Sequence, residues 1–397
     1  ATASFTPFTD VRSSTQVGAQ YAQETFQGTS ARGAVLTPGS SSLSGTSARF
    51  RVAEYNTDNV LLGIFAQEQV AWRDRVFVTL GIRGDRNSAF GERFGWVYYP
   101  TVNASWVASE EGFFPQNRVL SSLRLRAAYG QSGRQPNFRD AITYLNATVV
   151  RVDNAELPAV TFTQAGVGDP KLKPERTAEY EFGFDAGIAN DRVNLQVTYY
   201  DKTTRDLLVQ RPLAVSVGGS DTRFENIGRM SNKGWEMQLS GTVVRTDPAV
   251  LEIVLGGSLN ENKLIDLGAG ISPISFNGAR QQHRSGYPAG GWWQRTYTYS
   301  DANNDGMIAR SEVQLSDTAL YLGNPLPERE LQFQPALTLF RNVRIQALLS
   351  HRGGYKTLNN TDRFRCVFAQ NCLAINDPTQ PIEAQAAAIA GLLTTDA

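Results

Sequence analysis

An acidic stretch, DANNDGMIARSE at residues 301–312, carries oxygen-bearing side chains at the spacing found in calcium-binding loops. Its side chains and one backbone carbonyl group offer the hard oxygen ligands that Ca²⁺ prefers, and Gly306 allows the sharp turn that such a loop needs. We therefore predict a metal site formed by Asp301, Asn303, Asp305, the carbonyl group of Met307, and Glu312.

The segments on either side of this loop bear on its role. Neither WWQRTYTYS (292–300) nor VQLSDTALYLGNP (313–325) has apolar residues at helical spacing, so we do not expect a helix-loop-helix. The alternative to a bound ion is an acidic turn that stays solvated. If calcium binds, we expect it to be structural and to fix the shape of a loop.

Four aromatic residues precede the acidic loop, namely Trp292, Trp293, Tyr297 and Tyr299. Exposed aromatic rings beside polar residues can stack on sugars or pack against a partner protein. We therefore predict a substrate or partner contact here. The alternatives are packing within the loop itself and a ring of aromatic residues at a membrane interface.

The cysteines and histidines limit the chemistry that is available. Cys366 and Cys372 lie close together in a polar segment and predict a local disulfide formed in an oxidising compartment, the alternative being two unrelated thiols. Zinc would need further ligands nearby. His283 and His351 are the only histidines, and no hydrolase or phosphate-binding motif occurs, so we predict no catalytic residue and no enzyme.

Composition favours a β protein and argues against a nucleic-acid ligand. Lys plus Arg and Asp plus Glu number 38 each, so the chain has no net charge to attract nucleic acid. Its 35 Gly, 20 Phe and 14 Tyr residues suit pleated sheets. No apolar run approaches the roughly 18 residues of a membrane-spanning helix, and the first residues, ATASFTPFTD, show no signal peptide.

Alternation of apolar and polar residues runs through the chain and predicts β-strands. In AEYEFGFD (178–185), for example, Tyr180, Phe182 and Phe184 fall on one face and the carboxylates on the other. The same pattern occurs in RVNLQVTYY (192–200), WEMQLSGTVV (235–244), VLEIVLGGSLN (250–260), QFQPALTLF (332–340) and VRIQALLSHR (343–352), and more loosely at 60–72, 75–85, 96–107 and 123–130.

Short turns alternate with long connections. The turns near residues 190, 247 and 341 are tight, whereas the connections at 131–177, 201–232 and 261–330 are long and rich in Gly, Asn, Asp and Pro. Strands of about ten residues joined in this way are typical of outer-membrane barrels, with short periplasmic turns and long extracellular loops. A soluble β-sandwich is the alternative, but no second apolar layer is evident to cover each sheet.

Several segments resemble the SusC/RagA-type TonB-dependent transporters of Gram-negative outer membranes. NIGRMSNKGWEMQLSG (226–241) is the strongest match, because it is similar to the family's Asn-x-Gly-x-Met-x-Asn-x-Gly segment. The other similar segments, in the family's order, are GIRGDRNSAFG (81–91), YPTVNASWVASEEGF (99–113), AAYGQSGRQP (127–136), LKPERTAEYEFGFD (172–185), YYDKTTRDLL (199–208) and YLGNPLPE (321–328).

This resemblance implies a fold and a place in the cell. Residues 1–397 would be the middle and later part of an all-β, antiparallel transmembrane β-barrel, whose full form in the family has about 22 strands. We expect no plug domain within this stretch. The segment 261–330, which contains the acidic loop, would be extracellular, and the barrel would lie in the outer membrane of a Gram-negative bacterium.

The resemblance also implies a function and partners. The barrel would import oligosaccharides or peptides, with energy from the TonB complex delivered through the plug, and a SusD-like surface lipoprotein would cover the loops. If the apolar faces meet the lipid bilayer, polar residues on the opposite faces would line the lumen, including Glu179, Glu181, Gln196, Glu236 and Gln238.

Two other functions are consistent with the residues alone. The first is a soluble or secreted calcium-dependent β-rich binding or adhesion protein, in which the acidic loop is the functional site. The second is a secreted β-structured glycan hydrolase. Both differ from the transporter in that neither requires a lipid-facing surface.

Overall fold

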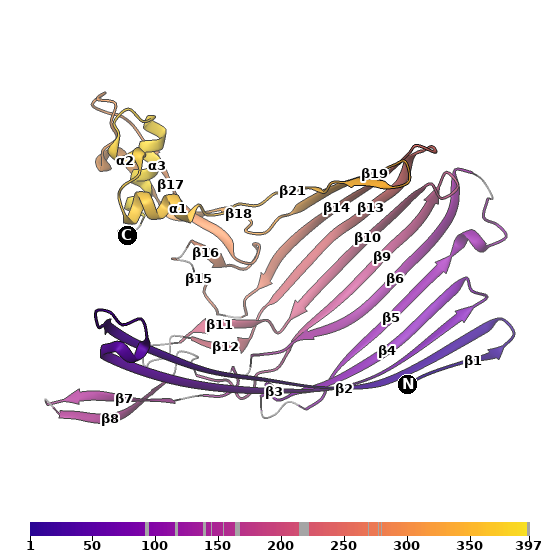
Figure 1. The fold of residues 1–397 in the computed structure, drawn as a ribbon, viewed down its shortest axis with the longest axis horizontal. Coiled ribbons are helices and arrows are strands. Elements are labelled where there is room, and N and C mark those ends of the chain that lie inside the picture. The colour runs from indigo at the N-terminus through magenta and orange to yellow at the C-terminus, as the bar shows by residue number, and fades with distance from the viewer. Residues whose placement is uncertain are drawn as a thin grey trace. The chain divides into compact units, whose positions relative to one another are not determined.

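The computed structural model describes all residues except 92–94, 116–117, 138–139, 144, 154, 163–166, 214–221, 269, 277, 279 and 395–397. Antiparallel β-strands make up most of the described chain (Figure 1). The chain divides into two compact units, Ala1–Arg229 and Met230–Ala397, which are described separately below.

The first unit contains an antiparallel sheet in which the strands follow one another in the order β1-β2-β3-β4-β5-β6-β9-β10. The strands run side by side in a slanted array (Figure 1), and the hairpins β7-β8 and β11-β12 form separate small sheets. Sequence order is kept because tight turns join only neighbouring antiparallel strands. The bounds are β1 (Thr2–Phe8), β2 (Val11–Leu36), β3 (Thr46–Trp72), β4 (Val76–Asn87), β5 (Val97–Val107), β6 (Leu120–Arg134), β7 (Leu145–Val152), β8 (Ala155–Phe162), β9 (Glu175–Ile188), β10 (Val193–Arg205), β11 (Leu208–Pro212) and β12 (Thr222–Asn226).

The register of this sheet keeps apolar and polar residues on opposite faces. Phe184 lies directly across from Leu125 of β6 and Val197 of β10, so three apolar side chains share a row. Glu181 lies across from Ala128 and Tyr200 on the other face. Because side chains alternate with a period of two, this register sets the two faces along the whole length of each strand.

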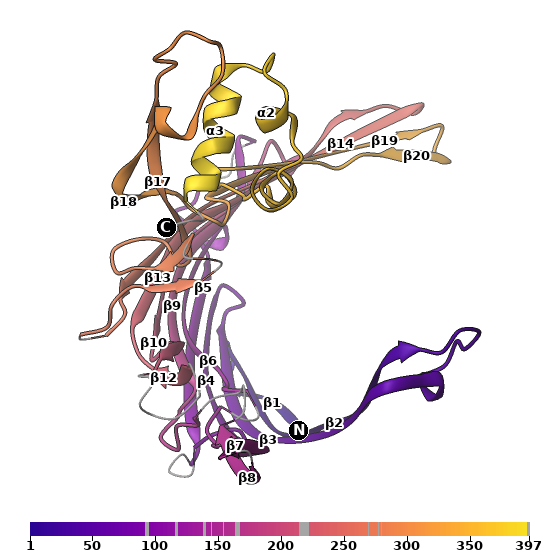
Figure 2. The same ribbon diagram turned by 90° about the vertical axis from the view of Figure 1, so that its left-hand side faces the viewer.

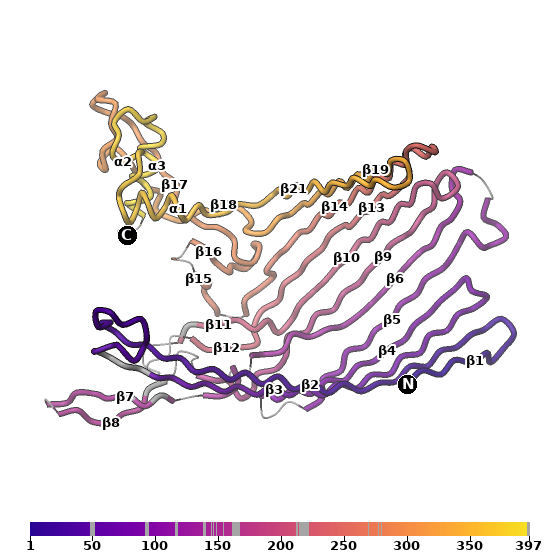
Figure 3. Tube along the Cα trace, viewed as in Figure 1, coloured from indigo at the N-terminus to yellow at the C-terminus, as the bar shows by residue number. Residues whose placement is uncertain are grey.

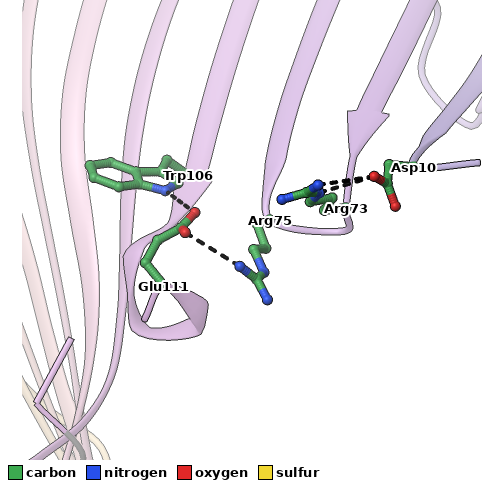
Figure 4. A network of polar contacts seen from close by, with 5 residues as sticks. All are labelled: Asp10, Arg73, Arg75, Trp106 and Glu111. Atoms are coloured by element: carbon green, nitrogen blue, oxygen red, sulfur yellow. Dashed lines mark hydrogen bonds and ion pairs between the residues drawn. The ribbon is translucent and has the colours of Figure 1, made fainter. Parts of the chain in front are cut away.

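Polar contacts hold the short turns of the first unit (Figure 4). Arg73, in the β3–β4 turn, donates from Nε and Nη2 to Oδ2 of Asp10, both at 3.1 Å. Glu111, after β5, accepts from Arg75 Nη1 at 3.3 Å and from the indole N–H group of Trp106 at 3.1 Å. These contacts tie each turn to its neighbour.

The tight turn predicted near residue 190 is confirmed. β9 and β10 pair from Ile188 and Val193 onwards, and the turn residues Ala189, Asn190 and Asp191 have φ values of 55°, 56° and 59°. Asn and Asp tolerate this left-handed backbone better than most residues, which explains why the sequence signal was reliable here.

One hairpin is much longer than the sequence indicated. β2 and β3 have 26 and 27 residues, and β4 pairs with β3 only over Leu61–Trp72. Residues 46–60 of β3 therefore pair with β2 alone, and the ribbon continues past the end of β4 (Figure 3). Phe26 and Tyr55 stack on it with ring centroids 6.0 Å apart.

Glycines face aromatic rings across the β2–β3 hairpin. Gly18 pairs directly with Phe65, and Gly28 pairs with Tyr55, so that each ring lies over a position without a side chain. A Cβ atom at either glycine would collide with the ring of its partner. Such pairs help to fix the register of a sheet.

The second unit contains a sheet in the order β13-β14-β19, with β20 and β21 both paired to β19, and a smaller sheet in the order β15-β16-β17-β18. Short helices follow. The bounds are β13 (Arg229–Arg245), β14 (Ala249–Asp266), β15 (Ile274–Phe276), β16 (Gln281–His283), β17 (Gly291–Tyr299), β18 (Val313–Gly323), β19 (Arg329–Leu339), β20 (Val343–Gln346), β21 (Leu349–Gly353), α1 (Asn360–Arg363), α2 (Leu373–Asn376) and α3 (Ile382–Leu393).

The structure corrects three details of the predicted arrangement. The connections 131–177, 201–232 and 261–330 contain strands and hairpins, because the backbone polar groups of long segments need hydrogen-bond partners. The strand predicted at 343–352 is divided into β20 and β21. The C-terminal segment forms helices, where no helix was predicted. Among the described residues, no helix is long and apolar enough to cross a membrane.

Helix α3 packs on the acidic loop (Figure 2). Its Ala386 and Ala390 are 0% and 2% exposed and form a small core with Ile308 and Val313. Small alanine side chains allow the helix to approach the loop closely. The acidic loop is therefore held by a core of its own within the second unit.

Candidate functional site

The first unit exposes large apolar side chains on one face of its sheet. Leu80 and Ile82 of β4 are 54% and 50% exposed, and Phe182 of β9 is 56% exposed. Further members of this set are Val78, Val102, Leu125 and Tyr180. Contiguous apolar surface of this extent is unfavourable in water and is typical of a membrane or protein contact.

The opposite face carries charges that bond across strands. Arg126 of β6 lies 3.0 Å from Asp185 of β9 and donates to the hydroxyl group of Thr198 at 3.2 Å. Gly183 leaves room for this guanidinium group, since a Cβ atom there would lie 3.2 Å from Arg126 Nη2. Lys202 of β10 pairs with Glu179 at 3.5 Å.

Three of the five residues predicted to line a lumen lie in the first unit. Glu179, Glu181 and Asp185 are separated by even numbers of residues along β9 and therefore lie on the same face. Gln196 lies directly across from Asp185 on β10, so it shares this polar face. In the second unit, Glu236 and Gln238 alternate along β13 with Met237, which is 45% exposed. The alternation that the sequence indicated is therefore present in the strands.

A hollow of about 420 Å³ lies on the polar face of the first unit. Its volume falls in the range of roughly 300–1,000 Å³ that is typical of small-molecule sites. Strands β3, β4, β5, β6, β9 and β10 contribute to it. It is lined by Gln69, Phe77, Thr79, Asn103, Ala104, Ser105, Arg124, Arg126, Ala127, Ala128, Glu181, Gly183 and Thr198.

The predicted metal ligands lie together between β17 and β18, so the expectation that the flanking segments do not form a helix-loop-helix is confirmed. Asp301 accepts hydrogen bonds from the amides of Asp305 and Gly306, at 3.1 and 3.0 Å. Other contacts of this kind join the side chain of Asn303 to the amide of Asp305, the side chain of Asp305 to the amide of Met307, and the carboxylate of Glu312 to the amides of Ala302 and Ala309.

The acidic side chains are thus engaged by amides of their own loop. Over the residues that the structure describes, no group of three or more His, Cys, Asp or Glu side chains is positioned to hold a metal ion. Carboxylate oxygens have more than one lone pair, so an amide contact does not by itself prevent ligation. Calcium binding stays a prediction.

Gln385 of α3 binds the backbone of the acidic loop through hydrogen bonds. Its side chain is buried, accepts from the amide of Ile308 at 3.0 Å and donates to the carbonyl group of Gly306 at 3.1 Å. It also donates to the carbonyl group of Gln380 at 2.8 Å. The residues on both sides of Met307 are therefore bound to one helix side chain.

The predicted aromatic contact is partly corrected by the structure. Trp293 is only 3% exposed, because its ring packs on Tyr287 and Tyr321 with centroids 4.7 and 5.5 Å away. The guanidinium group of Arg284 lies 4.3 Å from the centre of the Trp293 ring. Trp293 is therefore a core residue and not a surface contact.

The other three aromatic residues lie nearer the surface. Trp292 donates from its indole N–H group to the carbonyl group of Lys356 at 2.8 Å. Tyr297 is 38% exposed, and Tyr299 packs against the small core around Ile308. Sequence spacing alone did not single out Tyr287 or Tyr321, since the two lie far apart in the chain. In the fold their rings pack on each other, with centroids 5.1 Å apart, as well as on Trp293.

The two cysteines and His283 make contacts that stabilise the fold. A disulfide joins Cys366 to Cys372. His283, in the long connection of the second unit, accepts at Nδ1 from the amide of Gly290 at 3.1 Å. Burial lowers the pKa of His283 below its ordinary value, which favours the neutral ring that this hydrogen bond requires.

The comparisons with known proteins all point to TonB-dependent receptors. The family model described as "TonB dependent receptor-like, beta-barrel" matches residues 2–365. TonB-dependent receptor P26 of Formosa agariphila is 28% identical over 316 residues, covering 71% of this chain and 31% of that protein. TonB-dependent receptor SusC of Bacteroides thetaiotaomicron is 27% identical over 263 residues, covering 62% and 26%.

The fold is also found in solved structures. The RagAB peptide transporter superposes with a TM-score of 0.78 at 17% identity, over 92% of this chain and 42% of that one. At this level of identity the likeness concerns the fold. The chain spans about a third or less of the length of the curated relatives named above.

Proposed function

The chain belongs to the family of TonB-dependent receptor β-barrels, of the SusC/RagA type, and we propose that it forms part of the wall of an outer-membrane importer. The observation that carries this proposal is the two-faced sheet of the first unit. Its apolar face exposes residues such as Leu80 and Phe182, and its other face carries paired charges such as Arg126 and Asp185. Lipid on one side and water on the other satisfy both faces.

The cargo of such an importer is an oligosaccharide or a peptide. One solved structure with this fold is named a peptide transporter, and one relative is SusC. We propose that energy comes from the TonB complex, acting through a plug domain, and that a SusD-like surface lipoprotein covers the long loops. No catalytic step is part of this function.

The acidic loop and the surface aromatic residues have supporting roles in this proposal. Calcium in the 301–312 turn would be structural, because the turn is already fixed to α3 through Gln385. Trp292, Tyr297 and Tyr299, in the same long connection, would meet the substrate or the lipoprotein. Both roles place these residues on the outer side of the membrane.

Membrane fractionation tests the proposal. The protein should be recovered with the outer membrane and should need detergent for extraction, because its exposed apolar face is unfavourable in water. Uptake of labelled oligosaccharides and peptides by the producing cells should then be lost when TonB is deleted. Recovery from the soluble periplasm without detergent would refute the importer and would favour the soluble calcium-dependent binding protein.

A further inference from the structure

A carboxylate lies on the apolar face of the first unit. Glu68 of β3 is directly across from Leu80 of β4, and Leu80 is across from Val102 of β5. The same row continues through Tyr129 and Tyr180. Because residues directly opposite each other in an antiparallel sheet share a face, Glu68 lies among these apolar and aromatic side chains and not on the polar face.

In an outer-membrane barrel, the position of Glu68 along β3 lies inside the lipid layer. Trp72 ends β3 at a short turn, and Trp106 lies in the same row, with Val76 between the two. Aromatic residues at strand ends mark the membrane interface. Glu68 precedes Trp72 by four residues, which is about 14 Å along a strand. With a strand tilt of about 45°, Glu68 lies about 10 Å deeper than Trp72.

Glu68 receives its hydrogen bonds from the neighbouring strand β2. The hydroxyl groups of Ser13 and Thr15 donate to its two carboxylate oxygens. Among the residues that the structure describes, Glu68 forms no ion pair. A carboxylate group has about four lone-pair positions, so two hydroxyl donors leave part of its acceptor capacity unused. A charge in this state is unfavourable in lipid, where ionisable residues are rare and are paired with a partner.

The side chains around Glu68 leave its carboxylate group open to a neighbour. Ala66, two residues before Glu68, lies on the same face and is exposed. On β2, Thr15 is directly across from Glu68, and Ala3 of β1 is across from Thr15. Small and polar residues allow two membrane proteins to approach closely and to form hydrogen bonds between them. We call this surface, formed by Ser13, Thr15, Ala66 and Glu68, the β2–β3 patch.

We propose that the β2–β3 patch binds a second membrane-embedded protein, which presents a lysine or arginine side chain to Glu68. This inference rests on the proposed function, because the apolar face must lie in the outer membrane. Lipid chains carry no group that donates to a carboxylate. A second copy docked by the same patch would bring two Glu68 side chains together, and like charges repel strongly where water is excluded. A cationic side chain supplies both the missing charge and further hydrogen bonds.

Photochemical cross-linking of the full-length protein in native outer membranes tests the proposal. Benzoylphenylalanine in place of Leu80, directly across from Glu68, should attach to a protein segment that contains lysine or arginine. Glu68→Gln keeps the shape of the side chain and removes its charge, so the yield should fall roughly tenfold or more, the value of one charge-assisted contact. Benzoylphenylalanine in place of Phe182, on the same face of β9, is the control, and Glu68→Gln should not change its products.

The molecule attached at position 80 decides between the possible neighbours. A product of twice the protein's mass that contains only its own sequence would show a second copy on the patch. Attachment to lipid alone would show that no protein covers the patch. Either result would overturn the proposal, and so would an unchanged yield in Glu68→Gln.

Reconstitution in phosphatidylcholine vesicles gives a second measurement. The probe is a transmembrane peptide of about 20 leucine residues with one lysine about 10 Å from one end, and its control has methionine in that place. Energy transfer from the peptide to a fluorophore on the full-length protein should show that the wild type binds the lysine peptide roughly tenfold to a hundredfold more tightly. Glu68→Gln should bind both peptides equally. Equal binding of both peptides by the wild type would contradict the proposal.

Failure of this contact is distinguishable from failure of the importer. If the wild-type protein is found in the outer membrane and uptake depends on TonB, but position 80 attaches only to lipid, the protein contact alone is refuted. If the wild-type protein is not in the outer membrane, the importer itself is refuted, and the apolar face does not meet lipid.

Discussion

Removing the side chain of Gln385 should loosen both the acidic loop and α3. In Gln385→Ala, the buried amide of Ile308 and the part-buried carbonyl group of Gly306 lose their hydrogen-bond partner. The buried amide costs about 1–3 kcal/mol when it is unsatisfied, and the part-buried carbonyl group costs about 1 kcal/mol, so the local stability should fall by about 2–4 kcal/mol for the pair. The contact between Gln385 and Gln380 is lost as well.

Hydrogen–deuterium exchange with mass spectrometry measures this loss segment by segment. A fall of about 2–4 kcal/mol corresponds to exchange that is roughly 30-fold to several hundredfold faster, if the segment opens locally. The increase should appear in peptides covering residues 300–313 and α3. It should be absent from peptides of the first unit, where no contact is changed.

Two further variants separate hydrogen bonding from packing. Gln385→Met keeps a long side chain without hydrogen-bonding groups, so it should exchange nearly as fast as Gln385→Ala. Gln380→Ala removes a side-chain contact with Asp377 but leaves the hydrogen bonds of Gln385 to the loop, so it should exchange like the wild type. If Gln385→Ala exchanged at the wild-type rate over residues 300–313, the hydrogen bonds of Gln385 would contribute nothing to the local stability of the loop.

Three other perturbations have defined outcomes. Burial lowers the pKa of His283, whereas the unfolded chain keeps the ordinary value of 6.5, so the unfolded state binds more protons as the pH falls. Protection of β16 from amide exchange should therefore fall as the pH drops from about 7.5 to 5.5. His283→Asn should remove this pH dependence, and His351→Asn should leave it unchanged. Calcium titration should give a binding isotherm for the wild type and a flat one for Asp305→Ala; two identical flat isotherms would remove the predicted metal site. Glu111→Ala should reduce the local stability of the β5–β6 turn by about 1–2 kcal/mol, since the indole N–H group of Trp106 loses its acceptor, and unchanged amide exchange at residues 106–111 would contradict this.

Strands with strong alternation were predictable from the sequence. The residues of β9 and β10 alternate apolar and charged, and the turn between them has Asn190 and Asp191 at positions that require a left-handed backbone. Local sequence and long-range pairing agree there, so the hairpin and its two faces follow from the residues alone. The same reasoning placed Glu179 and Glu181 on the polar face.

The long ribbon of β2 and β3 was not predictable in the same way. Its outer part is rich in Thr, Ser, Ala and Gly, so its alternation is weak, and its strands are defined by pairing with each other. The burial of Trp293 depends on Tyr287, in the connection before β17, and on Tyr321, which lies directly across from it on β18. Neither feature leaves a local signal.

Helix α3 is a different case, because a signal was present. The segment IEAQAAAIAGLL is rich in alanine, the best helix former, and follows Pro381, a residue that often precedes or begins a helix. We predicted no helix there, since the expected elements were all strands identified by their alternation of apolar and polar residues. The helix also explains how the acidic loop is held, which the loop sequence alone did not indicate.

The glycine–aromatic pairs of the β2–β3 hairpin restrict how this region can change in evolution. If one strand gained or lost a residue between Gly18 and Gly28, one ring would meet a residue with a Cβ atom, and the side chains beyond would move to the wrong face. Insertions and deletions should therefore be confined to the tip at residues 37–45. Related proteins would then differ in the reach of this hairpin while keeping the same spacing between its glycines.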